Sequence, residues 1–253
     1  METRRLALAD VLTERVEIHT AEPVPMGAYL ARPAADEPSV GVLVAHELFG
    51  VTAHIRDVCE RLAGLGFVAL APDFYHRVSP AAALPHTAAG RDRGFELLGA
   101  LQRDETLTDA IAAHQYLRDR GCERISMLGL SLGGHIAYLA ATALPLRAVI
   151  AAYPGWLCDT KIGLGRPDPT VTLTPRIQGR VLLLIGDADH AVSQDDVTTV
   201  ATALQDAHVK HEVITYPGVP HGFLCDRRDT YSPDAASDAW AQIDAFLEPE
   251  LQD

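Results

Sequence analysis

Ser131 is the residue whose neighbours in the sequence most clearly mark it for chemistry. It is the serine of a Gly-x-Ser-x-Gly motif at residues 129–133. An apolar run, residues 124–128, precedes the motif, and an Ala-rich stretch, residues 133–144, follows it. A strand that turns sharply into a helix exposes a serine hydroxyl, and the two glycines leave room for the turn. The pattern predicts a nucleophilic serine, with the helix N-terminus and the backbone N–H of Leu132 favouring the negative charge that develops beside it.

A serine hydroxyl is a weak nucleophile until a base removes its proton. In chains that use this turn, an acid and then a histidine follow the serine. Asp187 and Asp189 both follow a late apolar run, and His221 follows the last predicted strand. We favour Asp189 because it lies further out, whereas Asp187 is better placed to hold the turn through backbone contacts. The sequence thus predicts a catalytic triad of Ser131, Asp189 and His221.

The elements that must position these residues alternate along the chain. Continuous apolar runs predict strands that are covered on both faces, and they lie at residues 40–45, 67–71, 124–128, 148–153, 181–185 and 212–216, after two shorter strands at 16–19 and 27–31. Helices are predicted near residues 55–65, 104–118, 133–144, 197–207 and 235–247, with loops at 78–94 and 154–179. This alternation predicts a mostly parallel sheet with helices on both faces and an antiparallel N-terminal edge.

Composition excludes several classes of protein. The 253 residues are 48% hydrophobic and 22% charged, which is ordinary globular usage and excludes a disordered or collagen-like chain. A net charge of −13 repels phosphate backbones, so nucleic acid is not an expected partner. The longest apolar stretch, residues 136–157, is interrupted by proline and arginine, so no membrane association is expected. No secretory signal is visible in residues 1–20, and we expect a cytoplasmic protein.

Neither a metal nor an organic cofactor is predicted. The four cysteines are widely scattered and lack zinc-like spacing, which is typical of buried, reduced thiols: Cys59, Cys122, Cys158 and Cys225. Residues 46–50, His-Glu-Leu-Phe-Gly, begin like the helix of a zinc protease, but a glycine stands where the second histidine belongs.

Several segments resemble the dienelactone hydrolase family of α/β-hydrolases. Residues 45–50 and 54–57 resemble its Glu-x-x-Gly segment and the following helix, and residues 71–77 resemble its Pro-Asp-Leu-Tyr-x-Arg segment. The remaining family motifs are matched by residues 129–134, 186–190 and 220–223, and by Tyr231, Ala235, Ala236 and Trp240. The resemblance covers roughly residues 15–248. It implies one α/β-hydrolase domain over residues 1–253, with no large cap domain.

The resemblance also implies roles for residues that spacing alone does not mark. The backbone N–H of Leu48 becomes a second oxyanion donor, beside that of Leu132. Glu47 and Arg77 become residues of the substrate site. In the family, the glutamate at this place contacts the resting thiol nucleophile; beside a serine, Glu47 either orients its loop or hydrogen-bonds the hydroxyl. Trp156 lies just past a predicted strand and is either a pocket residue or a core aromatic.

The chain departs from the family pattern at two places. The founding members carry a cysteine nucleophile, whereas Ser131 has a far higher pKa and depends more on His221 as its base. They also hold a substrate carboxylate with two arginines, of which one matches Arg77 and the other is replaced by Cys225. Arg227 and Arg228 lie near this second position but are shifted along the chain. Recognition of a substrate carboxylate is therefore expected to be weak.

These features predict a serine hydrolase that cleaves a small ester or lactone through an acyl-enzyme. The expected partner is the small-molecule ester or lactone itself, and the protein is expected to be a monomer or a homodimer. Two alternatives stay open. One is a thioesterase or acyl-peptide hydrolase that uses the same triad, and the other is a non-catalytic protein that binds a small ligand on the same fold.

Overall fold

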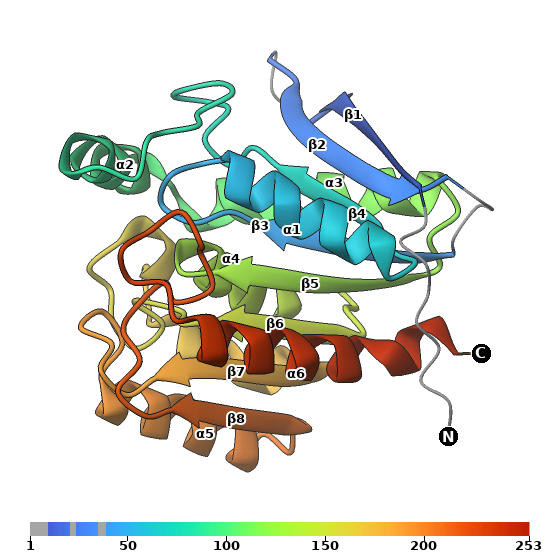
Figure 1. The fold of residues 1–253 in the computed structure, drawn as a ribbon. Helices are drawn as coiled ribbons and strands as arrows, with labels where there is room; N and C mark the ends of the chain where they lie inside the picture. The colour runs from blue at the N-terminus through green and yellow to red at the C-terminus, as the bar shows by residue number, and fades with distance from the viewer. Residues whose placement is uncertain (1–9, 21–23, 35–38, 253) are drawn as a thin grey trace.

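A sheet of eight strands runs through the molecule and is covered by helices on both faces (Figure 1). The computed structural model describes residues 10–20, 24–34 and 39–252. The strands are β1 (Val11–Ile18), β2 (Met26–Pro33), β3 (Val40–Ala45), β4 (Val68–Pro72), β5 (Arg124–Leu130), β6 (Ala148–Ala152), β7 (Arg180–Gly186) and β8 (His211–Tyr216). Their order across the sheet is β1-β2-β4-β3-β5-β6-β7-β8. β2 pairs antiparallel with both β1 and β4, and the other neighbours are parallel, which confirms the predicted α/β-hydrolase sheet.

Two helices lie on one face of the sheet and three on the other (Figure 1). α1 (Ala53–Gly64) and α6 (Pro233–Leu251) share one apolar cluster with the sheet. α3 (Arg103–Asp119), α4 (Leu132–Ala141) and α5 (Gln194–Asp206) share the other. No helix of the described residues is long and apolar enough to cross a membrane.

The central strands are apolar throughout because water reaches neither face of them. Every residue of β3, β4 and β6 is buried, which accounts for the unbroken runs in the sequence. The register of β3 on β5 pairs Ala45 with Gly129, so the loop after β3 and the serine turn after β5 begin at neighbouring points of one sheet edge. The fold thereby brings residues 46–50 beside Ser131.

A helix that sequence analysis missed lies against this loop. Residues 78–94 were interpreted as a loop, which is wrong from the start of α2 (Ala88–Ala100) onward. Its three glycines lower helix propensity, so the local pattern is weak. Thr87 caps the helix by accepting a hydrogen bond from the N–H of Gly90 at 3.2 Å. A Cβ on Gly94 would lie 2.8 Å from the carbonyl oxygen of Leu48, so glycine allows α2 to pack closely on the loop after β3.

Two short 3₁₀ helices, η1 (Gly163–Gly165) and η2 (Thr170–Arg176), structure part of the segment predicted as a loop at residues 154–179. Of the two, η2 is joined to α4 by a buried side-chain contact. His135 of α4 contacts the carbonyl oxygen of Gly155 at 2.9 Å and the hydroxyl of Thr170 at 2.8 Å. This segment is therefore held on the helix that follows the serine.

Candidate active site

Ser131 occupies a strained turn between β5 and α4. Its φ of 55° and ψ of −115° lie outside the regions that residues with a side chain usually adopt. A Cβ on Gly129 would lie 1.9 Å from the carbonyl oxygen of Gly133, and a Cβ on Gly133 would lie 2.0 Å from that of Ala45. Both glycines are therefore needed for the turn to form. Backbone strain of this kind costs about 1–3 kcal/mol and is typical of functional sites.

The structure brings Ser131, His221 and Asp189 together in a hydrogen-bonded line. The Oγ of Ser131 lies 2.8 Å from Nε2 of His221, and Nδ1 of His221 lies 2.8 Å from Oδ2 of Asp189. A proton on Nδ1 is donated to the carboxylate and leaves Nε2 free to accept the serine hydroxyl proton. This is the arrangement that base-assisted attack by a serine requires.

The two candidate acids have different partners. Oδ1 of Asp189 accepts hydrogen bonds from the N–H groups of Ala191 at 2.7 Å and Val192 at 3.1 Å, while Oδ2 faces the histidine. The side chain of Asp189 is fully buried. Asp187 instead accepts a hydrogen bond from the N–H of Gly218 and joins the loops after β7 and β8. The geometry thus places Asp189 at the histidine and gives Asp187 a turn-holding contact.

The peptide of Leu48 is held in place from two sides. The hydroxyl of Tyr75 donates a hydrogen bond to the carbonyl oxygen of Leu48 at 3.1 Å, and Gly94 of α2 packs against the same carbonyl. Leu132 is the first residue of α4, where backbone N–H groups have no partner within the helix. The two residues predicted as oxyanion donors therefore lie on the two segments that begin at the paired residues Ala45 and Gly129.

Glu47 is buried, and its carboxylate is paired with an arginine. Oε1 of Glu47 accepts a hydrogen bond from Nη1 of Arg228 at 3.4 Å, and this guanidinium lies 5.5 Å from the ring centre of Phe49. Oε2 has no hydrogen-bond partner among the described residues. One role considered for Glu47 was a hydrogen bond to the hydroxyl of Ser131. The structure has no such bond, because this hydroxyl is paired with His221.

Arg77 forms an ion pair with a buried carboxylate. Both of its terminal nitrogens donate hydrogen bonds to Asp109 of α3, and His76 contacts the same carboxylate at 3.2 Å. The side chain of Asp109 is 1% exposed. A substrate carboxylate would have to compete with Asp109 for this guanidinium. The predicted role of Arg77 in substrate binding stays a prediction.

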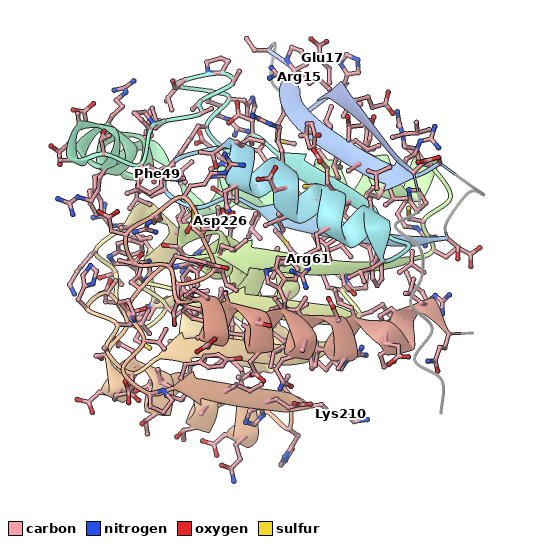
Figure 2. All side chains as sticks on the ribbon, viewed as in Figure 1. Arg15, Glu17, Phe49, Arg61, Lys210 and Asp226 are labelled. Carbon is pink, nitrogen blue, oxygen red and sulfur yellow. The ribbon has the colours of Figure 1, made fainter. Side chains whose placement is uncertain are left out.

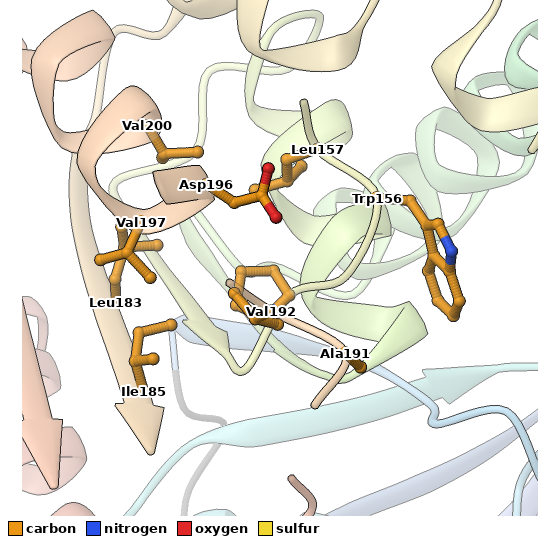
Figure 3. Close-up of a pocket in the computed structure, with 10 residues that line it drawn as sticks. Trp156, Leu157, Leu183, Ile185, Ala191, Val192, Asp196, Val197 and Val200 are labelled. Carbon is orange, nitrogen blue, oxygen red and sulfur yellow. The ribbon is translucent and has the colours of Figure 1, made fainter. Parts of the chain in front are cut away.

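Trp156 lies at the edge of a small apolar cavity between β7 and α5 (Figure 3). The volume of about 10 Å³ is near the minimum for one water molecule. Ala191 and Val192, which hold the carboxylate of Asp189, form part of its wall. The indole meets the ring of Phe95 of α2 edge to face, with ring centres 6.5 Å apart. The cavity is too small for an ester substrate, and its wall includes Ala191 and Val192 of the loop that carries Asp189.

Sequence analysis missed Tyr153, which packs on His221. Its ring meets that of His221 edge to face at 5.0 Å, and its other neighbour is the ring of Phe223 at 5.3 Å. Burial is the main cause, and the negative charge of Glu47 a smaller one, that raises the pKa of the Tyr153 phenol well above its usual range. The phenol is therefore neutral. Tyr153 ends an apolar run in the sequence, and nothing in that pattern distinguishes it from a core residue.

Comparison with known proteins places the chain among hydrolases. The model of the dienelactone hydrolase family matches residues 26–251. A Synechocystis sp. protein assigned as a carboxymethylenebutenolidase is 35% identical over 234 residues, which cover 90% of this chain and 93% of that protein. An Escherichia coli K12 protein with the same assignment is 34% identical over 225 residues, which cover 86% of this chain and 80% of that protein.

Comparison with solved structures gives the same family. A Klebsiella pneumoniae crystal structure assigned as a dienelactone hydrolase has a TM-score of 0.85 and 31% identity, covering 94% of this chain and 99% of that one. A Pyrococcus furiosus esterase has a TM-score of 0.69 at 19% identity, covering 94% of this chain and 90% of that one, which shows a shared fold. The matched family model and these identities show that the chain belongs to the dienelactone hydrolase family of hydrolases.

Proposed function

We propose that this protein is a serine hydrolase that cleaves a small ester or lactone through an acyl-enzyme. The observation that carries the proposal is the hydrogen-bonded line from Ser131 through His221 to the buried carboxylate of Asp189. The strained backbone of Ser131 adds support, because strain of this kind is typical of functional sites.

The reaction begins when Oγ of Ser131 attacks the substrate carbonyl carbon while Nε2 of His221 takes the hydroxyl proton. The N–H groups of Leu132 and Leu48 are proposed to bind the oxyanion, and each donor of this kind lowers the barrier by about 3 kcal/mol. His221 returns the proton to the leaving oxygen. Water, activated by the same histidine, then hydrolyses the acyl-enzyme, and Asp189 stabilises the imidazolium in both steps.

We propose that neutral esters are preferred over substrates that carry a carboxylate. Arg77 is paired with Asp109, and Arg228 is paired with Glu47. Each guanidinium is therefore neutralised by a carboxylate of the protein itself. Cys225 stands where the founding enzymes are expected to supply a further arginine. A substrate carboxylate gains little from cations that are already paired.

Labelling with a fluorophosphonate probe tests the proposed function. The probe should modify the intact protein at one residue, mapped to Ser131 by mass spectrometry, and should leave Ser131→Ala unlabelled. The intact protein should also hydrolyse aryl acetates, and Ser131→Ala should not. Equal labelling of the variant, or modification mapped to a cysteine, would contradict the assignment of Ser131 as the nucleophile. A folded protein that is neither labelled nor active would favour a ligand-binding role instead.

A further inference from the structure

Three side chains that commonly bind metals converge next to the triad. They are Glu47 in the loop after β3, His86 just before α2, and Cys225 four residues after His221. One potential ligand atom from each lies within 4.8 Å of the other two. No spacing motif joins the three in the sequence. None of them belongs to the proposed triad, although Glu47 and Cys225 stand at positions that the family resemblance assigns to the substrate site.

Two atoms of this cluster are buried without a hydrogen-bond partner. Glu47 and Cys225 are 1% and 0% exposed. Arg228 occupies Oε1 of Glu47, while Oε2 has no partner among the described residues, and the same holds for Nε2 of His86. Buried polar side-chain atoms are nearly always paired, because leaving them unpaired costs free energy. A bound cation would satisfy both atoms at once.

We propose that Glu47, His86 and Cys225 form a binding site for a divalent cation that accepts sulfur, nitrogen and oxygen ligands, with Zn²⁺ the best match. Zinc bonds of about 2.0–2.3 Å in a tetrahedron separate the ligand atoms by about 3.3–3.6 Å. The atoms must therefore move inward by about 1 Å. Ca²⁺ and Mg²⁺ prefer oxygen ligands only, so a set that contains a thiol does not suit them.

Two of the three ligands bind the ion as anions. Nε2 of His86 is buried without a hydrogen-bond partner among the described residues, so it is the ring nitrogen that would bind the ion. Cys225 binds as the thiolate: its S–H bond breaks, one proton leaves to solvent and the metal–sulfur bond forms. The thiolate and Glu47 bring two negative charges to the ion, and with Arg228 included the occupied cluster carries one net positive charge. Arg228 keeps Oε1 and orients the carboxylate from outside, as outer partners of metal ligands generally do.

Occupancy would tie together the loops that carry the proposed catalytic groups. The backbone N–H of Cys225 donates a hydrogen bond to the carbonyl oxygen of Gly222, the residue after His221. The ring of His86 meets that of Phe49 edge to face at 4.6 Å, next to Leu48. Figure 2 labels Phe49 and Asp226, the latter following Cys225, and both lie at the end of the sheet toward which β5 runs. The site therefore bridges the segments on either side of the triad.

Titration with Cd²⁺ tests the site directly, because a cadmium–thiolate bond produces an ultraviolet charge-transfer band. The intact protein should bind one Cd²⁺ with this band, and Zn²⁺ should displace it. Cys225→Ser should lose the band, and His86→Ala and Glu47→Gln should each weaken Cd²⁺ binding by at least about tenfold, as loss of one ligand predicts. Cys158→Ser is the matched control, since this second cysteine lies against Asp196 of α5, and it should keep both the band and the affinity.

A second control separates the cluster from the triad. Ser131→Ala and His221→Ala should retain Cd²⁺ binding. Zn²⁺ should also raise the thermal unfolding temperature of the intact protein in a concentration-dependent way, and His86→Ala should reduce that rise. An unchanged band in Cys225→Ser, unchanged affinity in His86→Ala, or no Cd²⁺ retained by the folded protein at micromolar metal would overturn the proposal. If Cys225→Ser does not fold, His86→Ala and Glu47→Gln decide it by the same titration.

Discussion

Replacing Asp189 with asparagine should invert the tautomer of His221, the proposed catalytic base. Oδ1 of Asp189 accepts two backbone N–H groups, and Oδ2 accepts the proton on Nδ1 of His221. In Asp189→Asn only one oxygen remains, and the two N–H groups require it. The amide NH₂ must then face Nδ1. An NH₂ group donates, so Nδ1 becomes the acceptor and the ring proton moves to Nε2, opposite Ser131.

A histidine with its proton on Nε2 cannot take the serine hydroxyl proton. Inversion of this tautomer in a serine triad costs about 10⁴-fold in kcat, which corresponds to about 5 kcal/mol of barrier. Asp187→Asn keeps an oxygen for the N–H of Gly218, and residue 187 is exposed. Its effect should be that of an ordinary surface substitution, about 0.5 kcal/mol or less in stability, and kcat should fall by less than about threefold.

The two variants should be compared by steady-state hydrolysis of an aryl acetate, with kcat and KM separated. Thermal unfolding of both proteins controls for loss of fold. A loss below about tenfold for Asp189→Asn would refute the tautomer argument. A reversed order, with the larger loss in Asp187→Asn, would show that Asp187 serves the histidine.

Three further outcomes follow from the geometry. Gly129→Ala should prevent stable folding, because the added Cβ would lie 1.9 Å from a backbone oxygen. Gly99→Ala is the control: its Cβ would have nothing within 4 Å, so its unfolding temperature should be unchanged or higher. Thermal unfolding of the two variants tests this prediction. Burial lowers the pKa of His135 to about 4, so as pH falls from about 6.5 to 4 the unfolded chain gains a proton that the folded chain does not. Stability should therefore fall by about 3 kcal/mol over this range, and denaturant unfolding of His135→Gln should show a smaller fall. Glu47→Gln should free the charge of Arg228 and raise kcat/KM for dienelactone relative to an aryl acetate; an unchanged ratio would show that this arginine does not face the substrate.

Burial on both faces made the central strands predictable from sequence. Val40–Ala45 has the predicted bounds because each of its residues is apolar and buried. β1 is longer than the predicted 16–19, since an edge strand with exposed polar residues shows a weak pattern. α2 was missed because its glycines oppose local helix formation, and packing on Leu48 is a tertiary contact that the local sequence does not contain.

The placement of the three proposed triad residues side by side was predictable because their order along the chain follows from the order of the strands. Ser131, Asp189 and His221 each follow a strand that ends at one edge of the sheet. Tyr153 directly follows β6 at the same edge, and His86 lies in the loop before α2, but neither was predicted. A residue at the end of an apolar strand, or a histidine in a loop, has no local signal that separates a site residue from a structural one.

Cys225 links the proposed substrate preference to the proposed cation site. An arginine at this position would place a fixed positive charge beside the buried carboxylate of Glu47, which would then have cations on two sides. With cysteine, Glu47 keeps Arg228 on one oxygen and leaves the other without a hydrogen-bond partner. The same replacement removes a cation that would attract a substrate carboxylate and adds a ligand that attracts a thiophilic metal. Restoring the charge with Cys225→Arg should therefore abolish Cd²⁺ binding and raise the relative rate for dienelactone together, and a change in one without the other would separate the two proposals.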